Sequence, residues 1–106
     1  MKHFYEPVLF ADIVVKIEKP KNDIWCGSSH TEQKKTKNGT FVRYVLTLEN
    51  KKDFYVLIHE CLHLVRRIFT DRDIPFNETN DELIAYYQSY LVKRIWKYLS
   101  KKNASK

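Results

Sequence analysis

The stretch TFVRYVLTLENKKDFYVLIHECLHLVRRIF, residues 40–69, decides the fold because its pattern changes once, near residue 50. Residues 40–48 are rich in β-branched and aromatic side chains, which favours a strand. Residues 54–69 are apolar on almost every side, which is typical of a helix buried on more than one face. Asp53 can cap this helix. The sequence therefore predicts a strand followed closely by a buried helix.

The flanking segments show the same division into strands before residue 50 and helices after it. Residues 8–17 are rich in Val and Ile, which predicts a strand. Asn38-Gly39 is a strong signal for a hairpin between residues 29–36 and 40–48. Apolar positions recur at helical spacing over about residues 81–99. Strands followed by helices predict the α+β class, with a small antiparallel sheet of about three strands packed on two C-terminal helices.

The composition limits the class of protein. The chain has 106 residues, of which 43% are hydrophobic and 14% aromatic, and this suits one folded domain over residues 1–106. No run approaches the ~20 apolar residues of a membrane span, and residues 1–7 do not look like a signal peptide. Cys26 and Cys61 fit free thiols. We therefore expect a cytoplasmic protein without a membrane partner.

The formal charge of +6 is placed unevenly along the chain. The last fourteen residues contain no acid and carry the cations Lys93, Arg94, Lys97, Lys101, Lys102 and Lys106. One interpretation is a solvated helix end whose cations complement the helix dipole. The other is a nucleic-acid-binding surface, although no nucleic-acid-binding motif accompanies the charge.

The predicted first helix contains an H-E-x-x-H pattern, HECLH, at residues 59–63. Residues four apart lie on one helix face, so His59 and His63 can bind the same tetrahedral Zn²⁺. Glu60 can then reach a water beside the ion without ligating it. These polar groups would cost desolvation free energy in so apolar a helix unless they have partners. The alternative is two hydrogen-bonded core histidines and a solvated Glu60.

A catalytic zinc site usually has three protein ligands and an open position for water. His3 and His30 are candidates for the third ligand, but they lie in the N-terminus and in a polar segment. Glu82 is better placed, nineteen residues after His63 and in the first turn of the second predicted helix. An antiparallel return would bring that turn towards the first helix. Glu82 could instead be an acidic residue favoured by the helix dipole.

The two motifs together resemble a known family. HECLH at residues 59–63, followed by DELIAY at residues 81–86, is similar to the gluzincin metallopeptidases, of which thermolysin is a member. It also looks like the very small metallopeptidases encoded by bacteriophages, over roughly residues 55–90. The resemblance implies a minimal zincin-like fold, Zn²⁺ as cofactor and a peptide or protein as substrate. For a phage-encoded protein, it implies action in the host-cell cytoplasm.

The resemblance also implies roles for individual residues. It makes His59, His63 and Glu82 the zinc ligands and Glu60 the general base of a hydrolase that uses metal-activated water. Where thermolysin-like enzymes have an Asp one turn after the glutamate ligand, this sequence has Tyr86, whose hydroxyl is a candidate second-shell or transition-state donor. The family further implies that the strand before the active helix, residues 40–48, pairs with an extended substrate.

Two other functions stay open. The first is a non-catalytic zinc-binding protein of phage type that binds a host partner and holds its metal in a closed site. The second is a basic nucleic-acid-binding module in which the HECLH motif is accidental. In every case Cys61 is expected to be a small core residue, because it points off the ligand face of its helix.

Overall fold

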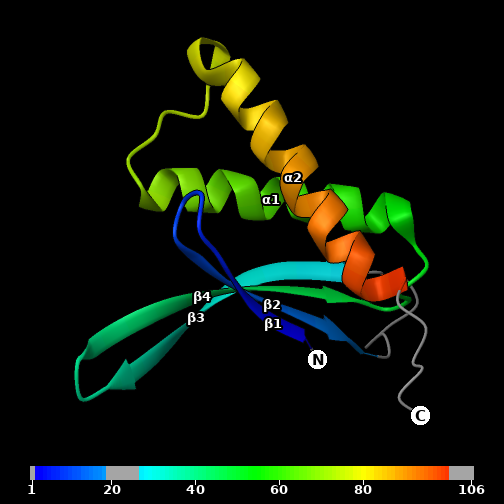
Figure 1. Ribbon diagram of the computed structural model, residues 1–106, viewed down its shortest axis with the longest axis horizontal. Helices are drawn as coiled ribbons and strands as arrows, with labels where there is room; N and C mark the ends of the chain where they lie inside the picture. The colour runs from blue at the N-terminus through cyan, green and yellow to red at the C-terminus, as the bar shows by residue number, and fades with distance from the viewer. Residues whose placement is uncertain (1, 19–26, 101–106) are drawn as a thin grey trace.

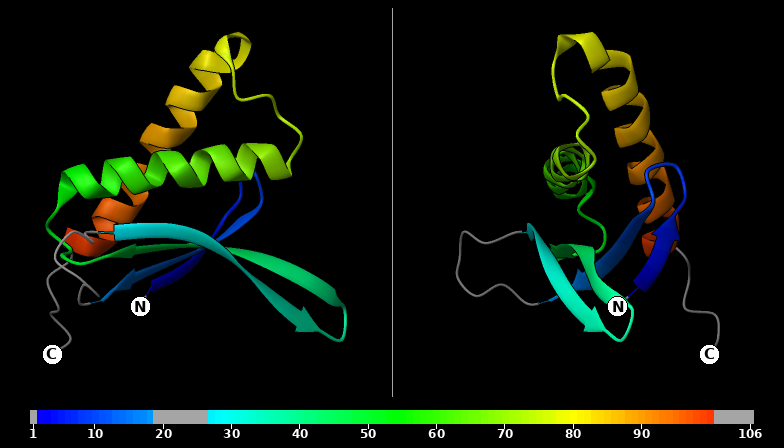
Figure 2. Two further views of the ribbon diagram at one scale, coloured as in Figure 1. Left: turned by 180° about the vertical axis from the view of Figure 1, so that it is seen from behind. Right: turned by 90° about the vertical axis from the view of Figure 1, so that its left-hand side faces the viewer.

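The computed structural model describes residues 2–18 and 27–100 and is of the α+β class (Figure 1). The chain forms β1 (Lys2–Glu6), β2 (Ala11–Ile17), β3 (Gly27–Thr36), β4 (Gly39–Leu48), α1 (Phe54–Asp71), the short 3₁₀ helix η1 (Glu78–Asn80) and α2 (Asp81–Ser100). Both long helices lie on one side of the sheet (Figure 2). The predicted fold class and the two C-terminal helices are confirmed. Cys26 and residues 101–106 lie outside the described part.

The sheet has four strands in the order β1-β2-β4-β3. β1 pairs antiparallel with β2, β2 pairs parallel with β4, and β3 pairs antiparallel with β4. The sheet is therefore mixed, with one more strand than the three predicted. The parallel pair arises because the chain passes through β3 before β4 enters the sheet beside β2. β4 consequently has a strand on each side, whereas β3 lies at an edge.

The prediction of one strand over residues 8–17 is wrong in its first part, because the chain turns before β2. Residues 7–10 form the turn between β1 and β2, and Phe10 has a φ of 58°. The Glu6 carboxylate accepts hydrogen bonds from the backbone N–H groups of Val8 and Leu9. The guanidinium of Arg72, just after α1, donates to the carbonyl oxygens of Leu9 at 2.8 Å and Phe10 at 2.6 Å. Polar contacts therefore override the strand preference of the apolar residues.

The predicted hairpin between β3 and β4 is confirmed, but its turn begins one residue earlier. Thr36 pairs with Gly39, so Lys37 and Asn38 form the loop. Gly39 has a φ of 127°, a conformation that glycine adopts without strain from a side chain. The hairpin extends past the part of the sheet that the helices cover (Figures 1 and 2).

The core lies between the sheet and the two helices. Alternate residues of the central strands point towards the helices, as strand geometry requires. The helices contribute apolar residues spaced three and four apart. Fully buried members are Ile13, Tyr44, Leu46, Leu48, Leu57, Leu64, Ile68, Tyr87, Leu91 and Ile95. None of the helices in residues 2–18 and 27–100 is long and apolar enough to span a membrane.

The start of α1 is fixed as the sequence predicts. The Asp53 side chain accepts a hydrogen bond of 3.1 Å from the backbone N–H of Val56. An N-cap of this kind satisfies one of the free N–H groups in the first helical turn. It therefore fixes the residue at which α1 begins.

Candidate active site

The two histidines of the HECLH motif lie together on α1. Their Nε2 atoms are 3.2 Å apart, and the rings meet nearly edge to face at an interplanar angle of 75°. Two nitrogen ligands of a tetrahedral zinc ion, with bonds of about 2.0–2.1 Å, are separated by about 3.3 Å. The same separation suits a hydrogen bond between the two rings. The distance between the two nitrogens is thus compatible both with two ligands of one ion and with a hydrogen bond, and the side chain of His59 is 69% exposed.

Glu60 lies between the histidines in sequence but is turned inwards. It is 9% exposed, and its Oε2 is 4.0 Å from Nε2 of His59. None of the described residues donates a hydrogen bond to this carboxylate. A nearly buried carboxylate usually has hydrogen-bond partners, because its desolvation is costly. Glu60 therefore keeps acceptor capacity beside the imidazole pair.

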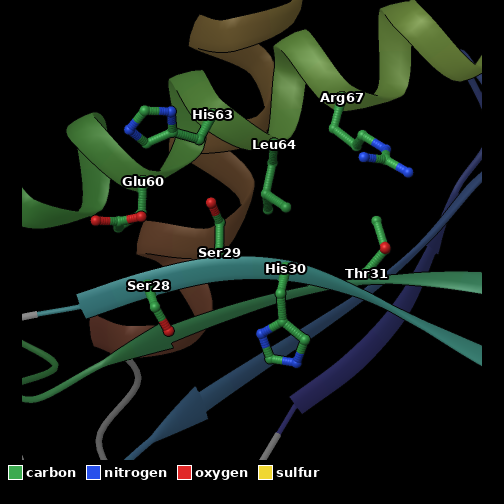
Figure 3. Close-up of a pocket in the computed structure, with 8 residues that line it drawn as sticks. All are labelled: Ser28, Ser29, His30, Thr31, Glu60, His63, Leu64 and Arg67. Atoms are coloured by element: carbon green, nitrogen blue, oxygen red, sulfur yellow. The ribbon is translucent and has the colours of Figure 1, made fainter.

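A groove of about 470 Å³ separates α1 from β3 (Figure 3). Its walls are Glu60, His63, Leu64 and Arg67 from the helix and Ser28, Ser29, His30 and Thr31 from the strand. Figure 3 shows the side chains of Ser29 and Thr31 directed towards α1, whereas His30 points to the other side of the sheet. The groove therefore brings the motif against a polar stretch of an edge strand.

The expectation that residues 40–48 pair with a substrate is corrected by the strand order. β4 is hydrogen-bonded to β2 on one side and to β3 on the other. Its backbone groups over residues 43–48 are thus engaged on both sides. Within the described residues β3 pairs with β4 alone. The backbone available to an extended chain beside α1 is therefore that of β3.

Gly27 allows β3 to approach α1, and sequence reasoning missed it. A Cβ at this position would lie 2.7 Å from Cγ1 of Val56, 3.0 Å from the carbonyl oxygen of Thr47 and 3.3 Å from Cγ of Glu60. Distances below 3.0 Å force neighbouring atoms to shift. The available signal was that the chain has only two glycines, of which one was already explained by the hairpin.

Arg67 is a second groove residue that sequence reasoning missed. It follows His63 by one helical turn, and Figure 3 shows its guanidinium over the groove. Its Nε lies 3.3 Å from Oδ1 of Asp71, whose other oxygen accepts a 2.7 Å hydrogen bond from the Tyr44 hydroxyl. Burial, together with this hydrogen bond, raises the pKa of Tyr44 to about 12. The hydrogen bond from Tyr44 thus holds Asp71 in place, and Asp71 in turn orients Arg67 along the groove.

The structure does not bring Glu82 and Tyr86 to the imidazole pair. Both lie on exposed parts of α2, and Tyr86 is 74% exposed. Figure 3 shows α2 behind α1, whereas His63 and Glu60 line the groove between α1 and β3. No three His, Cys, Asp or Glu side chains converge as metal ligands among residues 2–18 and 27–100. The ligand role of Glu82 and the donor role of Tyr86 stay predictions.

The other candidate residues lie elsewhere. His3 is 3.3 Å from Asp12 in the β1–β2 pair, and His30 is 3.2 Å from Glu32 on β3. The interaction with His30 lowers the pKa of Glu32.

Cys61 is fully buried, and burial raises the pKa of its thiol to about 12. The prediction that Cys61 is a core residue is confirmed, because a neutral, enclosed thiol is neither a nucleophile nor a metal ligand.

The site combines a nearly buried carboxylate, His63 and an edge strand in one groove, with the exposed imidazole of His59 next to His63. Of the two motifs that resemble gluzincins, HECLH on α1 contributes residues to this site. DELIAY on α2 contributes none in this structure. Comparisons with protein-family models, curated proteins and solved structures find no match to this chain.

Proposed function

We propose that the protein is a zinc-dependent hydrolase, and specifically a peptidase, with its active site in the groove between α1 and β3. The observation that carries the proposal is the 3.2 Å separation of the His59 and His63 Nε2 atoms beside Glu60. Neutral imidazole is a preferred zinc ligand, and this separation is close to the ~3.3 Å edge of a tetrahedral zinc site. A chance pair of surface histidines would not come with a nearly buried carboxylate at its side.

The donors that α1 supplies fit zinc, and the third ligand has to come from another part of the chain. We assign this role to Glu82. The assignment requires the first turns of α2 to move towards the imidazole pair. A hollow between the two helices is lined by Ile58 of α1 and Ser89 of α2, about two helical turns after Glu82. Small residues such as Ser89 and Ala85 also permit a closer helix contact.

The residues of the groove divide the work of peptide hydrolysis. Bound Zn²⁺ supplies Lewis acidity, which activates water and polarises a carbonyl group. Glu60 accepts the proton of the attacking water and passes it to the leaving amine. The rigid helix holds its carboxylate close to the imidazole pair, and near burial strengthens its electrostatic interactions. β3 aligns an extended peptide by offering its unpaired backbone groups.

Metal analysis of purified variants tests the site. We expect one zinc per chain in the wild type, no stoichiometric zinc in His59→Ala and His63→Ala, and sharply weakened binding in Glu82→Gln. His30→Ala is the matched control, because it removes an imidazole on the other side of the sheet and should retain zinc. Full zinc occupancy in His63→Ala would disprove the site, whereas full occupancy in Glu82→Gln alone would remove only that ligand.

Turnover separates a peptidase from a non-catalytic zinc protein. On a peptide library, Glu60→Gln should keep zinc while hydrolysis falls by about 10²–10⁴-fold, since that is the range of general-base contributions. Glu32→Gln removes an exposed carboxylate outside the groove and should leave hydrolysis unchanged. Unchanged turnover in Glu60→Gln would exclude it as the base. A wild type that binds zinc at this site but cleaves no peptide would support the non-catalytic alternative.

A further inference from the structure

A second groove lies along α2 and shares no residue with the first. It has a volume of about 470 Å³ and is lined by Tyr90, Lys93, Arg94, Lys97 and Tyr98. These positions are separated by three, four, seven and eight residues from Tyr90, so they form one stripe on the helix. Three cations and two aromatic rings therefore face the same hollow, and none of the described residues that line it is acidic.

Arg94 is held in place by aromatic residues. Its guanidinium carbon lies 4.3 Å from the centre of the Phe4 ring, within the range of a cation–π interaction. One of its terminal nitrogens donates a 2.9 Å hydrogen bond to the Tyr90 hydroxyl. The ring of Phe4 in turn packs against the ring of Tyr98, and the two ring centres are 5.3 Å apart. A guanidinium fixed in this way loses little side-chain entropy when an anion binds.

The charge in this groove is not neutralised within the described residues. Their ion pairs use Lys16, Arg67 and three histidines as cationic partners, and none uses Lys93, Arg94 or Lys97. Arg67 provides the contrast, because its charge is matched by Asp71. The helix dipole favours cations in the last turn of α2, but Lys93 and Arg94 lie well before that turn. An anionic ligand would supply the missing charge.

We propose that the groove along α2 binds single-stranded nucleic acid. The phosphates would lie against Lys93, Arg94 and Lys97, since a guanidinium matches phosphate oxygens and the lysines add charge at the rim. The bases would pack on the tyrosine rings, which suits a single strand because its bases are not enclosed in a duplex. This binding is independent of zinc and of hydrolysis.

Fluorescence anisotropy with labelled dT and rU twelve-mers tests the groove. Lys93→Ala/Lys97→Ala should weaken binding by roughly tenfold at low salt, and should reduce the slope of log K against log salt by about 1.4, or about 0.7 for each lost phosphate contact. Lys34→Ala/Lys35→Ala removes the same charge from β3 and should change affinity less than about twofold. All four residues of these two comparisons lie outside the zinc site, as do Tyr90 and Arg94, so zinc content should not change.

A second pair of variants tests the aromatic part. Tyr90→Leu should lower affinity at least about fivefold without changing the salt slope, because stacking is worth roughly 1–3 kcal/mol per base. Tyr90→Phe keeps the ring but removes the hydroxyl that holds Arg94, so it should bind more tightly than Tyr90→Leu and less tightly than the wild type. The proposal is overturned if neither oligonucleotide binds, if both lysine pairs weaken binding equally, if a duplex binds more tightly, or if polyglutamate competes as well as unlabelled dT.

Discussion

Two glutamates, Glu6 and Glu60, are buried in this small molecule and have very different surroundings. Glu6 is fully buried and accepts hydrogen bonds from the N–H groups of Val8 and Leu9 and from the Tyr87 hydroxyl. Glu60 is 9% exposed, and its nearest charged partner is His59 at 4.0 Å. Burying a carboxylate is costly, so three donors at Glu6 offset that cost, while Glu60 retains free lone pairs beside a groove.

The contrast teaches that burial alone does not identify a functional carboxylate. Glu6 joins the β1–β2 turn to α2 and has no acceptor capacity left for a reaction. Glu60 is placed by a rigid helix, borders the α1–β3 groove and has no donor among the described residues. A reaction needs a group that is both positioned and unsatisfied, and of these two glutamates Glu60 meets both conditions within the described residues.

Replacing each glutamate with alanine tests the comparison most directly. Glu6→Ala should lower the free energy of unfolding by about 3 kcal/mol, because one buried and two part-buried donors lose their acceptor at about 1 kcal/mol each. Glu60→Ala should change it by less than about 1 kcal/mol, since no donor among the described residues is left unpaired. Urea denaturation of both variants provides the measurement. Equal losses would show that the two carboxylates have the same structural role.

Alkaline pH tests the donor side of the Glu6 cluster. Burial, and then the hydrogen bond to Glu6, raises the pKa of Tyr87 above its ordinary value. Because the folded-state pKa is the higher one, this stabilisation is complete below about pH 10 and is lost as the pH rises, at about 1.4 kcal/mol per pH unit for one group. Unfolding followed from pH 9 to pH 11 should show this loss.

The tyrosine variants separate the contributions. Tyr87→Phe should be less stable at neutral pH by about 1 kcal/mol, because one hydrogen bond is missing, and should lose less stability above pH 10 than the wild type. Tyr44→Phe should reduce the alkaline loss in the same way, since burial and its own bond to Asp71 raise the pKa of Tyr44 to about 12. A wild type with the same alkaline profile as Tyr87→Phe would contradict the raised pKa.

The local features of the fold could be predicted from sequence. Helical spacing of apolar residues and the Asp53 cap give the start of α1 correctly, and the four-residue spacing of His59 and His63 places both on one face. Strand composition and Asn38-Gly39 give the β3–β4 hairpin. Each of these depends on residues within a few positions of one another, so side-chain chemistry and backbone geometry suffice.

The missed features depend on contacts between distant residues. β2 pairs with β4 because of how the chain crosses the sheet, and the turn after β1 is fixed by Arg72, more than sixty residues away in sequence. The groove depends on the approach of β3 to α1 and on Asp71, which orients Arg67. The placement of Glu82 depends on how α2 crosses α1. Periodicity describes each segment but does not determine these packing relations.

Gly27 sharpens the comparison, because it brings β3 close to Glu60. Gly27→Ala would put a Cβ 2.7 Å from Cγ1 of Val56, and we expect a loss of about 1–2 kcal/mol from overpacking. Adding Val56→Ala removes the clashing methyl group, so the double variant should lose less than the sum of the single losses. Thermal or urea unfolding of the cycle measures this coupling, with Ser28→Ala as a control in the same strand. Strict additivity would mean that the contact does not set the width of the groove.

If the contact between Gly27 and Val56 does set the width of the groove, Gly27→Ala should also reduce hydrolysis while leaving zinc bound. The strand would be displaced, and the imidazole pair would not.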